Sequence, residues 1–359
     1  MRLRHNCARV IAFSVPCLAS AALAPFNISL AQSQSSLPAP SNITIVLPPK
    51  LVLGRPATLA VFGADDKLAP NVDVDLNGVL HVRTNSTGRV SFLAPSSGNV
   101  LIAKAEGASA AALLDPAVPA SSTPAASATL TVAPIVSLRD RFPVCGPGLR
   151  GDANENRVKI NVEVSLILAA SPECLVILAP ENMPPGPARI SVETPDTQLT
   201  ASTILASLAF GPPNPPLLPG KSGVLALWVQ GTDQRLRVVV TNASPGVLSF
   251  AKGNEQQLLT TGGPQNFATM TATALSSGDF SLRARLLFAP DVATARRFLE
   301  AAVPLAAKND QVQITKLAKR LARHPRDAEK VRVQLSPILS RAAEGDLRIL
   351  LDAASHALE

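Results

Sequence analysis

Aromatic side chains are scarce in this chain. Its 359 residues include 11 Phe, a single Trp at position 228 and no Tyr. Proteins that bind single-stranded nucleic acid stack bases on aromatic rings, and sugar-binding surfaces use similar platforms. Charge is also nearly balanced, because residues 32–289 carry 18 Lys and Arg against 17 Asp and Glu, and residues 290–359 carry 12 against 9. We therefore expect no nucleic-acid partner, and the composition argues against sugar binding.

Residues that could carry catalysis or hold a metal are also few. His81, His324 and His356 stand apart from any cysteine or carboxylate pair at metal-ligand spacing. The string at Ser249–Lys252 matches S-x-x-K, but the partner motifs of penicillin-recognising enzymes are missing. Asp152–Asn156 has the alternate oxygens of a calcium loop, but Arg follows where that loop needs Gly, which favours an Asx-rich turn. We expect no catalytic, cofactor-binding or metal-binding residue.

Only the N-terminus carries a long apolar run. Arginines within the first nine residues precede an uncharged apolar stretch at 10–24, and small residues stand at −3 and −1 before a cut between Ala31 and Gln32. This is the pattern of a secretory signal peptide. We predict that residues 1–31 are removed on export, that 32–41 form a polar linker, and that the mature chain has no transmembrane segment. The expected location is the periplasm, the cell surface or the outside of the cell.

Cysteines reduce to one candidate pair in the mature chain. Cys7 and Cys17 lie in the signal, which leaves Cys145 and Cys174. An even number of cysteines in an exported chain favours a disulfide, and both fall at or near predicted strands of one unit. Two buried free thiols are the alternative.

Short alternating strands dominate the region after residue 41. Asn77-Gly78 separates two alternating runs, which predicts a hairpin because both turn residues adopt positive φ. Residues 158–166 alternate without a fault and predict one strand, and residues 268–273 and 280–286 alternate in the same way. Strands separated by turn signals at about 8–12 residues are typical of antiparallel sandwiches.

Two stretches resemble known modules. Residues 135–195 resemble an IPT/TIG domain, an immunoglobulin-like fold, on the motifs Cys145–Leu149, Val158–Val162, Leu175–Pro180 and Gly186–Val192. Residues 42–115 resemble a bacterial Ig-like module on the run Thr84–Phe92, and residues 216–288 are similar in style. The resemblance implies adhesion, spacing or surface display, and Ig-like modules share no active site.

Helical spacing replaces strand alternation after Pro290. Asp310 is a candidate cap for one helix and Ser336-Pro337 a candidate start of another, and Gly345 precedes the last. We expect three or four short helices that pack on each other or on the third sandwich, because short isolated helices are marginal in water. The apolar faces consist of Ile314, Leu317 and Leu321, and of Leu347, Leu350, Leu351, Ala354 and Leu358.

A basic face lies on the same helical segment. Lys316, Lys319, Arg320 and Arg323 share one side of the predicted helix, and residues 311–326 contain no acid. A solvated face opposite the apolar one is the ordinary interpretation. The alternative is contact with an anionic lipid, a cell-wall polymer or an acidic protein surface.

These patterns together predict a mostly β protein of tandem Ig-like antiparallel β-sandwiches followed by a short C-terminal α-helical segment. We place the β domains at 42–133, 134–198 and 199–289, and the helical segment at 290–359. The expected role is binding or scaffolding in the bacterial cell envelope or extracellular space, without cofactor or catalytic activity, toward an unidentified protein or envelope polymer. The competing hypothesis is an exported polysaccharide-acting enzyme or an accessory subunit of one.

Overall fold

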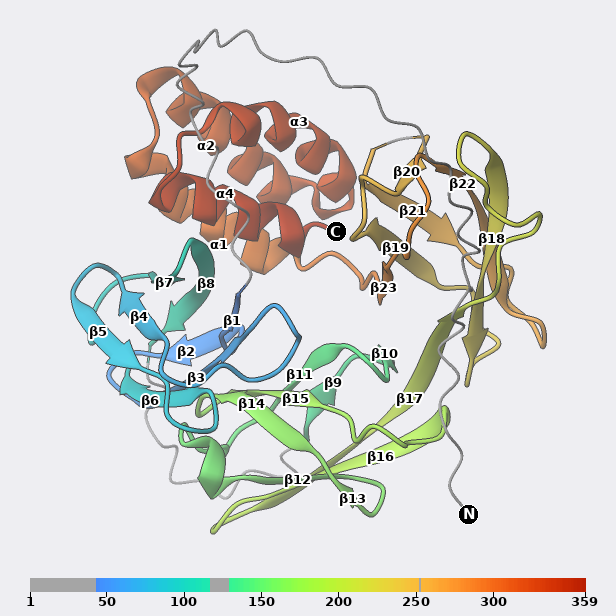
Figure 1. Ribbon diagram of the computed structural model, residues 1–359. Helices are drawn as coiled ribbons and strands as arrows, with labels where there is room; N and C mark the ends of the chain where they lie inside the picture. The colour runs from blue at the N-terminus through green and yellow to red at the C-terminus, as the bar shows by residue number, and fades with distance from the viewer. Residues whose placement is uncertain (1–42, 117–128, 252) are drawn as a thin grey trace, which may run out of the picture. The chain divides into compact units, whose positions relative to one another are not determined.

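The computed structural model describes residues 43–116, 129–251 and 253–359. They form a mostly β chain with several largely antiparallel sheets, followed by four α-helices (Figure 1). The predicted fold class is confirmed. The predicted signal peptide at 1–31 and the linker at 32–41 lie outside the described residues. Within the described ranges, no helix is long and apolar enough to cross a membrane.

The first sandwich places two sheets around one apolar core. One sheet has the order β1-β3-β6 and the other β2-β8-β7-β4-β5. Asn77 and Gly78 adopt positive φ between β4 and β5, so the predicted hairpin is confirmed. The strands are β1 (Thr44–Val46), β2 (Lys50–Val52), β3 (Pro56–Phe62), β4 (Asp73–Leu76), β5 (Leu80–Arg83), β6 (Arg89–Leu93), β7 (Val100–Ala105) and β8 (Ala108–Asp115).

The second sandwich has the strand order of an immunoglobulin constant-type domain. One sheet is β9-β11-β15-β14, and the other is β13-β12-β16-β17 with β10 beside β17. We count the divided strand β9/β10 as the first strand and leave out the short β13. One sheet then holds the first, second, fifth and fourth strands, and the facing sheet holds the third, sixth and seventh, as in a constant-type domain. The elements are β9 (Thr131–Val132), β10 (Ile135–Ser137), β11 (Arg141–Cys145), η1 (Ala153–Glu155), β12 (Arg157–Ile160), β13 (Glu163–Val164), β14 (Leu166–Ala170), β15 (Cys174–Leu178), β16 (Gly186–Glu193) and β17 (Gln198–Phe210).

In both sandwiches, proline divides the first strand between the two sheets. Pro48 and Pro49 separate β1 from β2, and Pro134 separates β9 from β10. Proline has no backbone N–H, so a ladder cannot run through it unbroken. The second half of each divided strand pairs in parallel with the last strand of its sandwich, β8 or β17, which departs from the predicted all-antiparallel pattern.

The single strand predicted over residues 158–166 is wrong. The chain turns at Asn161, which has φ 56°, and Val162 at the turn is 83% exposed. β12 and β13 therefore form a hairpin, and β14 crosses to the opposite sheet. Alternation alone could not locate the turn, because Val162 continues the apolar pattern while facing solvent.

The third sandwich shares a strand with the second. β17 pairs with β16 over residues 198–205 and with β18 over residues 207–210. We therefore propose moving the boundary expected at 198/199 to about residue 206, between the two pairings. The sheets have the orders β17-β18-β22-β20 and β21-β19-β23. The new strands are β18 (Ser222–Gln230), β19 (Arg237–Asn242), β20 (Leu248–Phe250), β21 (Glu255–Leu259), β22 (Phe267–Ala274) and β23 (Leu282–Leu286).

β structure also joins the first sandwich to the second. β3 pairs with β14 at Thr58 and Ala170, and the Thr58 hydroxyl donates to the Gly151 carbonyl at 2.8 Å. The Arg141 guanidinium lies 4.1 Å from the centre of the Phe62 ring. The junction also has its own small apolar core, formed by Val46, Ala60, Phe62, Leu168, Ala169 and Val176.

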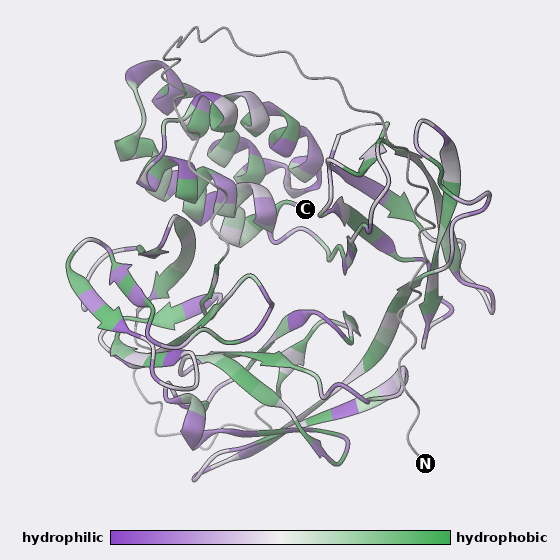
Figure 2. Cartoon of the chain, in the orientation of Figure 1, coloured by the Kyte–Doolittle hydropathy of each residue, from purple (hydrophilic) through white to green (hydrophobic). Residues whose placement is uncertain are grey.

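The C-terminal helices pack on each other and on the first sandwich. The expectation that the helices pack on each other is confirmed, and their shared core also includes Ile102 of β7 and Leu113 of β8, so the sandwich that contributes to it is the first and not the third. Figure 2 shows apolar and polar residues alternating around these helices. The elements are α1 (Val292–Ala302), η2 (Val303–Leu305), α2 (Lys308–Arg323), η3 (Pro325–Asp327), α3 (Ala328–Arg341) and α4 (Asp346–Ala357).

Two predicted helix starts are wrong. α2 begins at Lys308, so Asp310 lies in its first turn, where a carboxylate still suits the helix dipole. Pro337 lies inside α3, where the apolar side of the helix is held in the bundle by Leu335 and Ile338. Tertiary packing thus outweighs the helix-breaking tendency of proline there.

Candidate functional site

The predicted basic face lies on the outer side of α2. The inner side of this helix is fixed by burial, because Ile314 and Leu321 are 0% exposed and Leu317 is 6% exposed in the helical core. With 3.6 residues per turn, fixing this side directs Lys316 and Lys319 away from the core. Both are exposed, as is Arg323 in the last turn.

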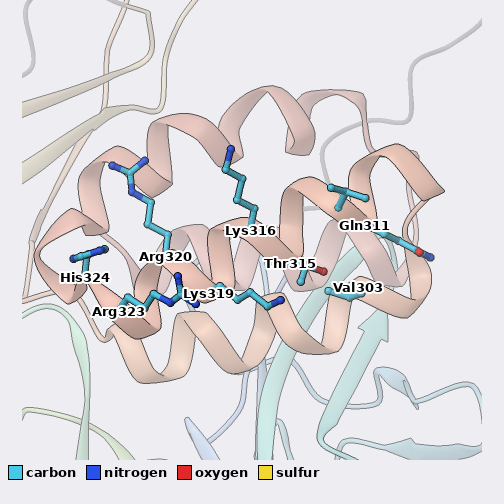
Figure 3. A pocket seen from close by; sticks show the side chains of 9 residues that line it. Val303, Gln311, Thr315, Lys316, Lys319, Arg320, Arg323 and His324 are labelled. Carbon is cyan, nitrogen blue, oxygen red and sulfur yellow. The ribbon is translucent and has the colours of Figure 1, made fainter.

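A groove of about 680 Å³ runs along these cations (Figure 3). Besides the four predicted residues it includes His324, which follows the helix, and Val303 from η2. Val312 is 70% exposed and places an aliphatic side chain one turn before Lys316. The lining consists of Val303, Gln311, Val312, Thr315, Lys316, Lys319, Arg320, Arg323 and His324.

Arg320 differs from the other three predicted cations. Its guanidinium binds the Asp327 carboxylate at 2.9 Å, and hydrogen bonds from Arg320 and then Lys330 hold the pKa of Asp327 below its usual value. Arg320 therefore ties α2 to the turn that leads into α3. Within the part of the chain that the structure describes, Lys316, Lys319 and Arg323 form no ion pair.

The groove thus combines three unpaired positive charges with an aliphatic end. Such a surface attracts anions over a range set by ionic strength, while Val303 and Val312 offer apolar contact. Its chemistry fits an elongated anionic partner with some apolar surface.

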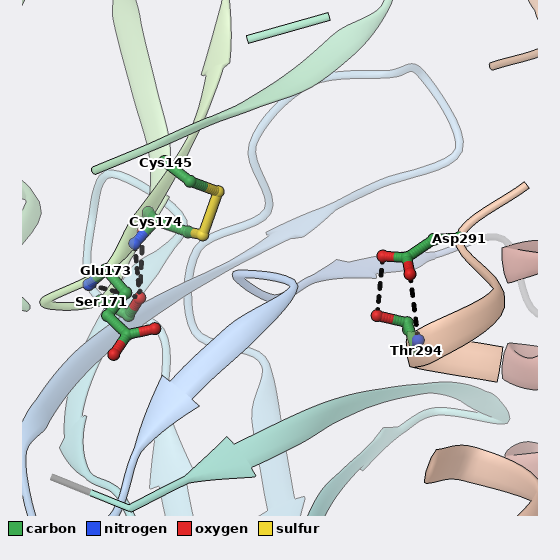
Figure 4. The surroundings of a disulfide bond; sticks show 6 residues. All are labelled: Cys145, Ser171, Glu173, Cys174, Asp291 and Thr294. Atoms are coloured by element: carbon green, nitrogen blue, oxygen red, sulfur yellow. Dashed lines mark hydrogen bonds between the residues drawn. A yellow bond between two sulfur atoms is a disulfide. The ribbon is translucent and has the colours of Figure 1, made fainter. Parts of the chain in front are cut away.

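The two cysteines of the described residues form a disulfide in the second sandwich. Cys145 of β11 and Cys174 of β15 lie opposite each other on neighbouring strands of one sheet (Figure 4). The bond of antibody domains instead joins the two sheets. Ser171 secures the turn before Cys174, because its hydroxyl accepts from the Cys174 amide at 3.0 Å and donates to the Cys174 carbonyl at 3.1 Å. The bond joins two neighbouring strands of one sheet.

The other candidate residues have structural roles. Asp152 caps η1 by accepting from the Asn154 amide at 2.9 Å, and the Asn156 side chain binds the Arg150 backbone, as an Asx-rich turn does. One carboxylate oxygen of Asp152 and the side-chain oxygen of Asn156 are thus engaged within the turn. Across residues 43–116, 129–251 and 253–359, no group of three or more His, Cys, Asp or Glu is arranged to hold a metal ion.

His356 belongs to a charged contact at the C-terminus. It lies 3.5 Å from Asp352 and 3.4 Å from Glu359, and the hydrogen bonds that it donates to these carboxylates raise its pKa to about 10. Glu359 also pairs with Arg285 of β23. The contact links the helical segment to the third sandwich. No local sequence pattern predicts it, because Arg285 and Glu359 lie 74 residues apart.

No protein-family model and no curated protein matches the chain. Solved structures similar to it include the extracellular region of plexin A4, at 12% identity and a TM-score of 0.26 over 71% of this chain and 24% of that one. Invasin, a bacterial integrin-binding protein, is 13% identical with a TM-score of 0.20, over 68% and 59%. A glucan-utilisation protein from Bacteroides ovatus, SGBP-B, is 11% identical with a TM-score of 0.18, over 72% and 63%. The chain spans about a quarter of the plexin structure, and these distant likenesses carry no functional argument.

Proposed function

We propose that this chain is an exported bacterial binding or scaffolding protein of the cell envelope or extracellular space, without catalytic activity, whose groove on α2 binds an anionic envelope polymer or protein. We further propose that the second sandwich is an IPT/TIG-like domain, on its sequence motifs and strand order. The observation that carries the binding proposal is the set of unpaired cations, Lys316, Lys319 and Arg323, beside an aliphatic groove end. Free charges on a firmly packed helix need no rearrangement to accept a ligand.

The way in which α2 is held in place supports a role in binding. Its buried inner side and the Arg320–Asp327 ion pair fix the helix, so the backbone positions of the exposed cations are fixed as well. The helical segment is also joined to the first sandwich, because the Lys104 ammonium of β7 lies 2.6 Å from the Asp346 carboxylate of α4. A rigid array of like charges favours a linear polyanion or an acidic surface over a small ion, because several contacts form at once.

The test measures binding of the full mature chain to immobilised polyglutamate and to polyphosphate. K316E/K319E/R323E reverses the three unpaired cations of the groove and keeps Arg320, and K308E/R326E/R348E makes the same change in net charge at exposed cations outside the groove lining. We expect about tenfold or greater loss of affinity for the first variant and much less for the second, with wild-type binding weakening as salt rises. Equal losses in the two variants would show diffuse attraction and refute a groove site.

One observation favours the competing hypothesis, an accessory role toward polysaccharide. Trp228 of β18, the single Trp of the chain, is 43% exposed, and its ring centre lies 5.2 Å from that of Phe267 on the neighbouring strand. An exposed Trp ring backed by a half-buried Phe can stack on the apolar face of a sugar. Glycan-array binding that Trp228→Ala abolishes and Val224→Ala retains would support it, since Val224 is equally exposed on the same strand.

A further inference from the structure

The third sandwich lacks the strand that completes the other two. In the first sandwich β7 lies between β4 and β8, and in the second β16 lies between β12 and β17. The equivalent strand of the third sandwich is β23, which pairs with β19 on one side. Among the described residues no strand pairs with its other side, because the chain leaves β23 for α1.

The core side of β23 is correspondingly less covered. Leu101 of β7 and Ile190 of β16, which face the cores of complete sandwiches, are 0% exposed. Leu282 and Ala284 of β23 are only partly buried against their core, and Phe280 just before the strand is 36% exposed. A strand added beside β23 would cover this apolar ridge.

The backbone of β23 can receive such a strand. The Leu287 amide donates to the Arg237 carbonyl at 2.9 Å, and the Ala243 amide donates to the Ser281 carbonyl at 3.0 Å. Odd-numbered residues of β23 therefore bond to β19, and the N–H and C=O groups of Leu282 and Ala284 point to the open side. An edge of this kind is a template for β-strand addition.

We propose that the open edge of β23 binds an extended segment of another protein, with apolar residues facing the core and carboxylates facing outward. The outward arginines supply the charge complementarity. Arg283 already pairs with Asp66 at 2.8 Å, both of them more than half exposed, and Arg285 pairs with Glu359. This side of the strand is thus a carboxylate-binding surface, and the exposed pair at Arg283 can exchange its partner for one on the added strand.

Charge and burial narrow the choice of occupant further. If two copies of the chain paired through antiparallel β23 edges, Arg283 of one would lie close to Arg285 of the other, and like charges across a ladder are destabilising. Near the end of the strand, burial raises the pKa of Asp140, while hydrogen bonds from Ser137 and the Leu286 backbone lower it. Asp140 therefore occupies that end, and the added strand lies alongside Leu282 and Ala284.

The experiment measures binding of a short synthetic peptide of alternating valine and glutamate to the full mature chain, with an alternating valine and lysine peptide as the comparison. Ala284→Pro removes the N–H that faces the open side and leaves the bonds to β19, and Ala284→Ser is the matched control that keeps it. We expect Ala284→Pro to weaken the glutamate peptide about tenfold or more and Ala284→Ser to leave it unchanged.

Arg283→Glu provides a second test that does not depend on how well the proline variant folds. It should weaken the glutamate peptide and strengthen the lysine peptide. Equal binding by the proline and serine variants, or no preference between the peptides in the wild-type chain, would overturn the proposal. A dimer that Ala284→Pro dissociates would assign the edge to a second copy, and peptide binding that appears only after residues 32–41 are deleted would assign it to the chain's own N-terminal segment. Either result overturns the proposed partner.

Discussion

Leu113 of β8 is the position where docking of the helical segment can be tested most sharply. It is 1% exposed and belongs to the helical core, whereas its neighbours Ala112 and Leu114 belong to the core of the first sandwich. β8 is therefore buried on both faces. Leu113→Ala removes side-chain atoms from the helical side of the strand and leaves the sandwich side intact.

The expected cost follows from burial. Truncating a fully buried leucine to alanine in a packed core costs about 2–5 kcal/mol, which includes the cavity left behind. A loss of about 3 kcal/mol at Leu113 lowers the ratio of docked to undocked helices by roughly 100-fold. The ion pair between Lys104 and Asp346 has both side chains nearly half exposed and contributes at most about 1 kcal/mol, so it cannot compensate.

Limited proteolysis at increasing urea concentration reports the docking equilibrium directly. Leu113→Ala should be trimmed back to about residue 290 at a clearly lower urea concentration than the wild-type chain, with the β sandwiches still protected. Leu93→Ala is the matched control, because Leu93 of β6 is 60% exposed. If the two variants are trimmed at the same urea concentration, Leu113 does not hold the helices and the docking argument is wrong.

Three more predictions concern covalent, steric and electrostatic restraints. Replacing Cys145 and Cys174 with serine removes a bond that closes a 29-residue separation and should cost roughly 3–4 kcal/mol of unfolding free energy, measured by urea denaturation. Mass spectrometry after alkylation of the native chain should find no modified thiol at Cys145 or Cys174. Gly151→Ala should destabilise strongly, since its Cβ would lie 1.8 Å from a backbone oxygen of β3, and a thermal midpoint equal to that of the wild-type chain would contradict the close approach. Burial raises the pKa of Glu359, but hydrogen bonds from His356 and a β23 arginine outweigh it and hold the pKa at about 2. The C-terminal contact should therefore weaken as pH falls from about 4.5 through 2, and also as pH rises from about 6.5 through the His356 pKa of about 10, as protease sensitivity of α4 against pH would show.

Strands with one polar face are visible in the sequence, and strands buried on both faces are not. Alternating apolar and polar residues and the Asn77-Gly78 turn predict β4 and β5, because one side of that hairpin faces solvent. β8 has no alternation, since Ala112, Leu113 and Leu114 are all buried between the sandwich core and the helices. The lack of alternation in β8 arises because its second face packs on the helices, which lie far away in the chain.

The candidate groove was partly predictable for the same reason. The helical period places the four cations on one side of α2, because that side faces solvent whatever the other side packs against. The pairing of Arg320 with Asp327 depends on the turn at η3, and the contribution of Val303 depends on how η2 folds against α2. Both contacts arise from tertiary structure, and no spacing rule within one helix encodes them.

The two proposed surfaces rest on different forces, which keeps their tests independent. Attraction to Lys316, Lys319 and Arg323 is a Coulomb effect between exposed charges, and it is screened as the Debye length falls from about 10 Å at 0.1 M salt to about 3 Å at 1 M. Strand addition at β23 gains backbone hydrogen bonds and burial of Leu282 and Ala284, which salt does not screen. High salt should therefore abolish binding at the groove while it removes only the part of the β23 interaction that depends on Arg283. A partner whose binding survives salt and is lost in Ala284→Pro uses the sheet edge, and one with the opposite behaviour uses the groove on α2.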